Sequence, residues 1–284
     1  MTRMSLLFQR LALLLVFLIA VPAPASAAFW DSYRSETLAF TPADWPAKLE
    51  GDLFVPKDKK KGPYPVVVLV HGGAWNKGDK KTMNKAGRAL AEKGYAAFAV
   101  NYRLAPQHQY PAQLDDMLQA LRWLKQNAPH YGLDANRVAL WGYSAGGHLA
   151  SLVGVQPITT DIPPIRVVIA GGAPADLRTS DAPSVRAFLG GTRQDKAAVY
   201  SDASPITHVQ SGLPAFFLYH GGRDELVEPS QSERFAAALK EEGVPVQFVK
   251  IDGKDHRQAA SAVKRYLPDM MGFLEKYLGP AARQ

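Results

Sequence analysis

The sequence predicts an α/β fold with a mostly parallel, doubly wound sheet and helices on both of its faces. From residue 64 onward, short apolar segments alternate with segments of helical spacing, a pattern typical of a parallel sheet. The segment "YPVVVLVHGG" at 64–73 is rich in valine and ends in glycines, as expected of a strand buried on both faces. No repeat or linker divides the chain, so we expect one domain over residues 28–284.

Residues 1–27 have the three regions of a secretory signal peptide. Arg3 and Arg10 precede or flank the apolar run 11–21, and "ASA" at 25–27 is a small-x-small cleavage signal. The alternative is a membrane anchor, but the run is shorter than the roughly 20 residues that span a bilayer. We therefore expect cleavage after Ala27 or Ala28, and a secreted or periplasmic protein with no stable membrane span.

The composition excludes several classes of function. The chain has 284 residues and no cysteine, which excludes disulfides, thiolate metal sites and a cysteine nucleophile. The formal net charge is +7, but the only basic run, "KDKKK" at 57–61, stands beside a Gly-Pro turn and is typical of a solvated loop. No nucleic-acid motif is present, so we expect no nucleic-acid partner.

The elements are expected in the following order along the chain. Strands are expected at 48–56, 64–73, 95–102, 137–142, 166–172, 213–222 and 245–252, and helices at 84–93, 110–128, 145–154, 229–243 and 257–278. The first strand alternates polar and apolar residues and stops at a proline, which indicates an edge or antiparallel strand. The helix at 110–128 has a proline near its start and one apolar stripe.

Two segments, together with residues near Trp75, are expected to shape a pocket. Residues 174–212 contain several prolines, serines and glycines, so we expect an irregular cap or lid. Residues 29–47 are rich in aromatic residues, which either cover a site or pack on the core. Packing on the core is the more common outcome for such residues.

The stretch "WGYSAGG" at 141–147 places Ser144 between a predicted strand and a predicted helix. Gly142 and Gly146 complete the pattern G-x-S-x-G, in which glycines allow a sharp turn and the serine takes a strained conformation. The following helix directs its positive end toward the turn. The same pattern can arise by chance in a Gly-Ser turn, but the flanking strand and helix favour a nucleophile.

A serine hydroxyl is a weak nucleophile and needs a base. His256 is the main candidate because it follows the last predicted strand and can reach the serine from the same sheet edge. His71 and His220 each precede Gly-Gly at a strand end, and His148 lies one turn beyond Ser144. We expect His148 to be a packing residue of the helix.

The base needs an acid to orient it and to balance its charge. Asp224 follows the predicted strand 213–222, whereas its rivals Asp252 and Asp255 stand beside His256. Asp224 also gives the chain order Ser, Asp, His of the α/β-hydrolase triad. For the oxyanion of acyl transfer, we expect one amide from Ala145 and others from the loop "HGGAW" at 71–75, whose alternative interpretation is a plain Gly-Gly turn.

The combined motifs resemble a known family. "HGGAW", "NYRLAP", "YPAQLDD", "RVALWGYSAGGHLA" and "HGGRDELVEPSQS" are similar to those of α/β-hydrolase esterases related to hormone-sensitive lipase, in the branch of bacterial feruloyl-esterase-like and acetyl-esterase-like carboxylesterases. The resemblance covers roughly 48–275. It implies an α/β-hydrolase fold and a carboxylic ester hydrolase without cofactor or metal. By motif position it implies a triad of Ser144, Asp224 and His256.

The resemblance also implies the oxyanion amides and shows two departures from the family pattern. Gly73, Ala74 and Ala145 would supply the amides, with Gly72 shaping the turn. Ala74 stands where a third glycine is frequent, and Arg257 stands after the histidine where a small residue is usual. The substrate would be a small-molecule or polysaccharide-linked ester.

Two other functions remain open from the sequence. "HGGAW" also resembles the H-G-G-x-W motif of kynurenine formamidases, which hydrolyse an N-formyl amide, although a signal peptide argues against that intracellular role. The third function is a non-catalytic binding module on the same fold. Such modules commonly lack a triad residue, and here all three candidates are present.

Overall fold

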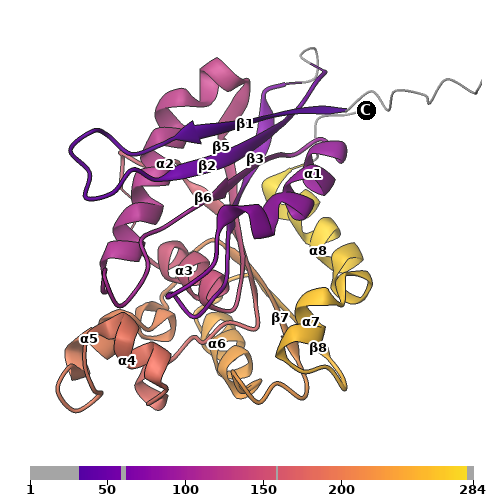
Figure 1. The fold of residues 1–284 in the computed structure, drawn as a ribbon. Coiled ribbons are helices and arrows are strands. Elements are labelled where there is room, and N and C mark those ends of the chain that lie inside the picture. Colours follow the sequence, from indigo (N-terminus) through magenta and orange to yellow (C-terminus); the bar gives the residue numbers. More distant parts are fainter. Residues whose placement is uncertain (1–31, 59–61, 158, 280–284) are drawn as a thin grey trace, which may run out of the picture. The chain divides into compact units, whose positions relative to one another are not determined.

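Eight strands form one sheet in the order β1-β2-β4-β3-β5-β6-β7-β8 (Figure 1). The strands are β1 (Tyr33–Ala39), β2 (Glu50–Pro56), β3 (Tyr64–Val70), β4 (Ala96–Val100), β5 (Leu133–Tyr143), β6 (Ile165–Gly171), β7 (Ala215–Gly221) and β8 (Val246–Ile251). The computed structural model describes residues 32–58, 62–157 and 159–279. The predicted signal peptide at 1–27 lies outside these residues, and the chain from Ser32 onward groups as one unit.

The sheet is mostly parallel, as predicted. Strands β3 to β8 run parallel to one another, whereas β2 pairs antiparallel with both β1 and β4. Strand β1 was not expected, because its exposed residues have no apolar alternation from which a strand could be recognised. Strand β1 is the edge strand. The strand predicted at 48–56 corresponds to β2, which is antiparallel as expected but is the second strand from the edge.

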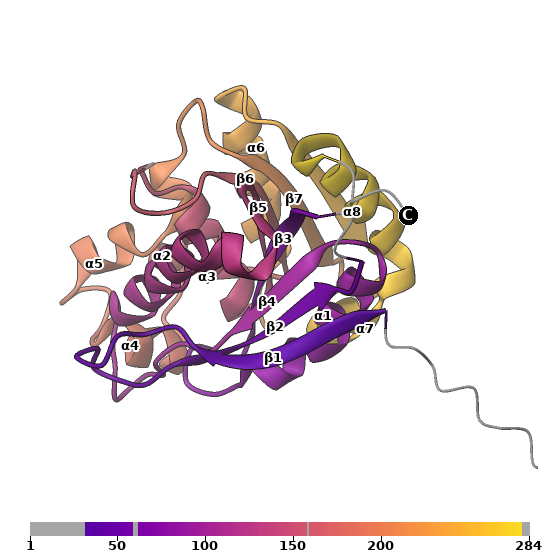
Figure 2. The same ribbon diagram turned by 90° about the horizontal axis from the view of Figure 1, so that it is seen from above.

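Helices cover both faces of the sheet (Figures 1 and 2). They are α1 (Asn84–Glu92), α2 (Ala112–Tyr131), α3 (Ala145–Gly154), α4 (Pro183–Leu189), α5 (Ala197–Asp202), α6 (Ser230–Glu241), α7 (His256–Ser261) and α8 (Val263–Leu278). The core lies in two clusters, one on each face. Along β3, Val66, Val68 and Val70 belong to the cluster with α2, α3 and α6, and Val67 and Leu69 to the cluster with α1 and α8. The division follows from the alternation of side chains across a strand, and both sets are fully buried because helices cover both faces.

Two segments differ from the sequence-based expectation. Residues 174–212 are not irregular: they contain α4, α5 and the short 3₁₀ helices Leu177–Thr179 and Pro205–His208. The predicted helix at 257–278 is two helices, since the backbone leaves helical geometry at Ala262 (φ −79°, ψ 40°). Helices as short as α4 and α5 carry too little periodic pattern for recognition from sequence.

The segment after β1 packs on the core and is not an open pocket wall. Phe40 is buried at 1% exposure and stacks edge-on against Phe98. The Trp45 indole donates a hydrogen bond to Asp116 of α2 (2.8 Å). Phe40 and Trp45 therefore pack on the core, which was one of the two outcomes expected for the aromatic residues in 29–47.

The arrangement brings the candidate site residues to one edge of the sheet. After β3 the chain forms β4 on one side, and β5 then pairs on the other side of β3. This reversal of direction is a switch point, and in open α/β sheets ligands bind at the carboxyl ends of the strands beside it. The loop 71–75 follows β3 and Ser144 follows β5, so both lie at this point.

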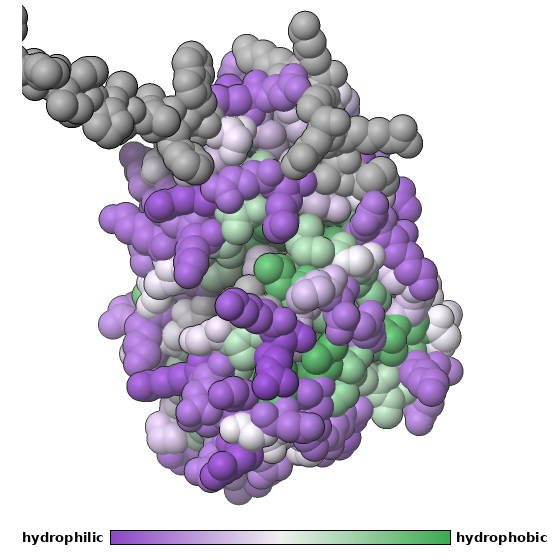
Figure 3. All heavy atoms as spheres, turned by 90° about the vertical axis from the view of Figure 1, so that its right-hand side faces the viewer, coloured by the Kyte–Doolittle hydropathy of each residue, from purple (hydrophilic) through white to green (hydrophobic). Residues whose placement is uncertain are grey.

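The face formed by α1, α7 and α8 is mainly hydrophilic, with a smaller group of apolar side chains between (Figure 3). Among the described residues, Leu226 is the large hydrophobic residue that is exposed to solvent, with a relative accessibility of 75%. Within the same residues, no helix combines the length and apolar character that a membrane crossing requires.

Candidate active site

Ser144 occupies a strained turn between β5 and α3. Its backbone has φ 56° and ψ −124°, a conformation that costs a non-glycine residue about 1–3 kcal/mol. Two hydrogen bonds hold the turn: the Ser144 amide donates to Gly171 O (2.8 Å), and Ser144 O accepts from the His148 amide (2.9 Å). Hydrogen bonds on both sides of the turn thus hold the Ser144 backbone in this strained conformation.

The two glycines of G-x-S-x-G are required by close approach of the backbone. A Cβ on Gly142 would lie 2.2 Å from the Gly146 carbonyl, and one on Gly146 would lie 2.1 Å from Val70 O. Both distances are far below contact range, so α3 can start this close to β3 and β5 only without side chains at these positions.

The loop after β3 lies directly beside the serine. A Cβ on Gly72 would meet Tyr143 O at 2.8 Å and the Ser144 Cβ at 3.5 Å. The next three residues all have positive φ: Gly73 123°, Ala74 52° and Trp75 59°. Within the described chain, the Gly73 and Ala74 amides donate to no backbone or side-chain acceptor. Two free N–H groups therefore lie in the loop that flanks Ser144.

Trp75 links this strained loop to the nucleophile helix and to the 174–212 segment. Its indole N–H donates to His148 Nδ1 (3.1 Å), and its ring stacks on Phe188 of α4 (4.6 Å between centroids). His148 Nε2 in turn donates to Ala203 O (2.8 Å). The bond accepted by Nδ1 requires a neutral imidazole with its proton on Nε2, and burial lowers the pKa of His148 to about 4. The packing role expected for His148 agrees with these contacts.

Asp224 is a buried carboxylate with four donor groups around it. Its Oδ1 accepts from the Leu226 and Val227 amides (3.0 and 2.9 Å), and its Oδ2 accepts from His256 Nδ1 (2.6 Å). His220 Nε2 lies 3.1 Å from the same Oδ2 and shares its N–H with Val227 O (2.8 Å). Burial raises the pKa of the Asp224 carboxyl, but the hydrogen bonds from His220, His256 and Val227 outweigh it and hold that pKa well below its usual range.

His256 begins α7 and lies at the mouth of the site. The short hydrogen bond to the Asp224 carboxylate requires a proton on His256 Nδ1. In the neutral ring, Nε2 is therefore the nitrogen that can accept a proton. The Tyr143 hydroxyl donates to His256 O (2.5 Å), and the two rings are 5.1 Å apart. Because Tyr143 precedes Ser144, this contact brings the base and the serine turn to the same place.

The rival residues have other partners. Asp255 caps α7 by accepting the Gln258 amide (2.8 Å), and Asp252 is exposed. His71 is buried and stacked on Tyr102 (4.2 Å). His256 thus contacts Asp224 rather than either adjacent aspartate, and the roles of base and acid stay a prediction.

Three residues shape the site through contacts that sequence reasoning did not predict. His220 contacts Asp224 from four positions earlier, and its Nδ1 lies 2.7 Å from Ser232 Oγ. Trp75 and Tyr143 make the contacts described above. A signal existed only for His220, whose spacing to Asp224 in "HGGRD" allows contact across a tight turn. The partners of Trp75 and Tyr143 are 73 and 113 residues away, so no local pattern reveals them.

Comparisons with known proteins show that the chain is similar to esterases. The BD-FAE family model matches residues 51–239. The probable carboxylic ester hydrolase LipM of Mycobacterium tuberculosis is 32% identical, over 69% of this chain and 49% of its own length. The carboxylesterase NlhH of the same organism is 33% identical, over 65% of this chain and 63% of its own. The chain thus spans about half to two thirds of the length of these relatives.

Solved structures share the fold. The esterase Est2 of the planctomycete Thermogutta terrifontis superposes with a TM-score of 0.73 at 24% identity, over 85% of this chain and 92% of its own. A truncated carbohydrate esterase from gut microbiota gives a TM-score of 0.74 at 23% identity, over 87% and 97%. These likenesses confirm the predicted α/β-hydrolase fold.

Proposed function

The chain belongs to the BD-FAE family, and from this premise we propose that it is a serine carboxylesterase acting through an acyl-enzyme on Ser144. The observation that carries the proposal is the buried Asp224–His256 pair at 2.6 Å, joined through Tyr143 to a serine with a strained backbone. Similarity to carboxylesterases such as NlhH supports the reaction class.

In the first half-reaction His256 acts as general base. Its Nε2 takes the Ser144 hydroxyl proton as Oγ forms a bond to the ester carbonyl carbon. The carbonyl oxygen becomes an oxyanion, which the amides of Gly73, Ala74 and Ala145 stabilise. When the carbon–oxygen bond to the alcohol breaks, the proton on His256 passes to the leaving oxygen.

In the second half-reaction water replaces the alcohol. His256 removes a proton from water, whose oxygen bonds to the acyl carbon, and the bond to Ser144 Oγ then breaks as Oγ regains the proton. Asp224 stays ionised throughout and balances the imidazolium. The chemistry needs no cofactor.

Ala74 serves as a donor despite replacing a glycine. A backbone amide donates regardless of its side chain, and Ala74 already has the positive φ of the loop. The buried Trp75 contacts offset part of the backbone strain, because stacking and a buried hydrogen bond contribute on the order of 1 kcal/mol each.

The proposed setting is outside the cytoplasm, supported by the signal-peptide pattern at 1–27. There the substrates would be small-molecule or polysaccharide-linked esters. The 174–212 segment packs against the Trp75 end of the oxyanion loop through Phe188, so it would bound the acyl side of the site.

The test is hydrolysis of a p-nitrophenyl ester series from acetate to decanoate, together with an N-formyl aromatic amide. We expect ester hydrolysis by the wild type, none above background by Ser144→Ala, and a chain-length profile that sizes the acyl pocket. Faster turnover of the formamide than of every ester would favour the formamidase alternative. Inertness toward both would favour a binding module.

A further inference from the structure

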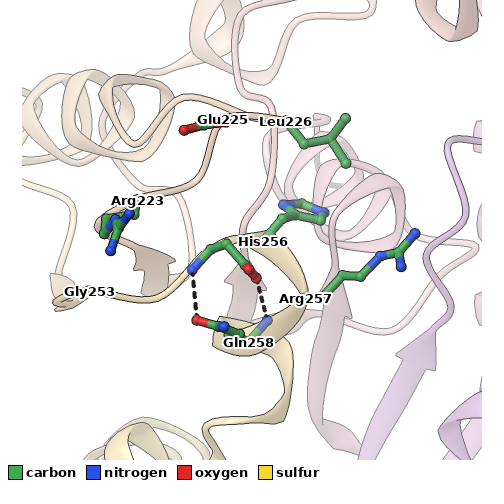
Figure 4. Close-up of a pocket in the computed structure, with 8 residues that line it drawn as sticks. Arg223, Glu225, Leu226, Gly253, His256, Arg257 and Gln258 are labelled. Carbon is green, nitrogen blue, oxygen red and sulfur yellow. Dashed lines mark hydrogen bonds between the residues drawn. The ribbon is translucent and has the colours of Figure 1, made fainter.

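A cavity of about 430 Å³ opens beside His256 (Figure 4). It lies between the loop after β7, which contributes Leu226, and the start of α7, which contributes His256 and Arg257. Ser144 and the 72–75 loop do not line it. The cavity is therefore lined by the proposed base, but by neither the proposed nucleophile nor the oxyanion loop.

We propose that this cavity binds the alcohol part of the ester, and that Arg257 selects alcohols that carry a carboxylate or a similar anion. The proposal rests on the esterase function proposed above. In that reaction His256 returns its proton to the leaving oxygen, so the alcohol must lie against the imidazole. A cavity lined by the same imidazole is then the space into which the alcohol extends.

The walls of the cavity suit an organic anion. Leu226 is 75% exposed and offers an apolar surface, while Arg257 offers a guanidinium. In Figure 4 the His256 ring lies between these two side chains, with Leu226 above it and Arg257 below and to the right. A planar guanidinium pairs with a carboxylate through two parallel hydrogen bonds. An aromatic or sugar acid would thus contact Leu226 with its apolar part and Arg257 with its charge.

The acidic residues of the cavity leave Arg257 open for a ligand. Asp255 is engaged by the Gln258 amide as the cap of α7. Glu225 extends to the left of His256 in Figure 4, toward the side of Arg223 and away from Arg257. Arg257 is exposed and lines the cavity. Among the described residues no carboxylate forms a salt bridge with its guanidinium.

The experiment compares two acetate esters that differ only in the alcohol: 4-carboxyphenyl acetate and the neutral 4-carbamoylphenyl acetate. Both give the same acetyl-enzyme, so deacylation is identical and kcat/KM reports acylation alone. The ratio of the two kcat/KM values measures recognition of the carboxylate. It is determined for the wild type, Arg257→Gln, Arg257→Glu and the control Arg265→Gln, an exposed arginine on α8 that does not line the cavity.

We expect Arg257→Gln to lower the ratio about fivefold, the size of one solvent-accessible ion pair, and Arg257→Glu to lower it further. Turnover of the neutral ester should stay within about twofold in both variants, which also shows that they fold. Arg265→Gln should leave the ratio unchanged, and added salt should reduce the wild-type ratio by screening.

Two negative results have different meanings. If the wild type cleaves both esters and Arg257→Gln has the same ratio as the wild type, the anionic subsite is overturned while the esterase stands. An equal drop in Arg265→Gln would also overturn it, because the effect would then come from the overall field. If the wild type cleaves neither ester, the proposed esterase fails and this inference fails with it.

Discussion

At the scale of single residues, the proposed site depends on the burial and the hydrogen bonds of the Asp224 carboxylate. Two amides and two imidazoles donate to a carboxylate that is only 3% exposed. A carboxylate with four donors neither rotates nor takes up a proton near neutral pH. It can therefore fix the tautomer of His256 and balance the charge that the ring acquires.

Asp224→Asn should abolish most activity while leaving the fold intact. An asparagine keeps the size but can present an N–H to His256 Nδ1, which favours the wrong tautomer. We expect kcat to fall by on the order of 10⁴-fold, as the same change does in another Ser-His-Asp triad. Steady-state kinetics with p-nitrophenyl acetate check this, with circular dichroism as the folding control. Activity within tenfold of the wild type would argue against Asp224 as the acid.

The same carboxylate should contribute stability that is lost in acid. The pKa of Asp224 in the folded protein lies below that of an unfolded aspartate, about 3.9. The ionised form therefore adds stability above that value, and the contribution is lost as the pH falls through the folded pKa. The difference in free energy of unfolding between wild type and Asp224→Asn should be steady near pH 5 and shrink toward pH 2. Urea titrations measure it, and a difference that grew in acid would contradict the assignment.

Trp75→Phe should separate the hydrogen bond from the stacking. Phenylalanine can still stack on Phe188 but leaves the buried Nδ1 of His148 without a donor, which costs about 1–3 kcal/mol. We expect that loss in urea unfolding, and a fall in kcat larger than the rise in KM because the Gly73 and Ala74 amides lose their support. If kcat is unchanged while stability falls, Trp75 serves the core alone.

At the scale of elements, the tight junction of β3, β5 and α3 determines where the serine lies. Gly146→Ala should be severely destabilising, because its Cβ would lie 2.1 Å from Val70 O. Gly272→Ala is the matched control: it lies in α8 with nothing within 4 Å of the added Cβ, and should stabilise the helix by up to about 1 kcal/mol. Thermal unfolding of both variants tests the contrast, and equal effects would contradict it.

Elements with a strong periodic pattern could be predicted from the sequence, and weak ones could not. The helix at 145–154 was predicted with the bounds that α3 has, since an apolar segment follows the glycines directly. Strand β1 was missed because it is an exposed edge with no apolar face. Helices α4 and α5 were missed because their contacts, such as that of Phe188 with Trp75, are tertiary.

At the scale of the whole molecule, chain order and sheet topology allowed the contact between Asp224 and His256 to be predicted. In a parallel sheet every strand delivers its following loop to the same edge, so residues after β3, β5, β7 and β8 had to converge. Asp224 and His256 are therefore expected to lie together, although they are distant in the sequence. The contacts of His220, Tyr143 and Trp75 could not be predicted in this way, because they depend on how side chains pack across strands.

Export is testable on the whole molecule. If residues 1–27 are a signal peptide, the protein recovered from the periplasm or medium of an expressing bacterium should begin at Ala28 or Phe29. N-terminal sequencing of that material decides the point. A cytoplasmic protein that retains Met1–Ala27 would contradict the proposed setting, without affecting the catalytic proposal.

The most direct test of the central claim is to locate the nucleophile by covalent labelling. The protein is treated with a serine-reactive fluorophosphonate and its intact and peptide masses are measured. We predict one added phosphonyl group on Ser144 in the wild type and none in Ser144→Ala, with labelling slowed in Asp224→Asn. Labelling of a different residue, or no labelling of a folded wild-type protein, would contradict the account.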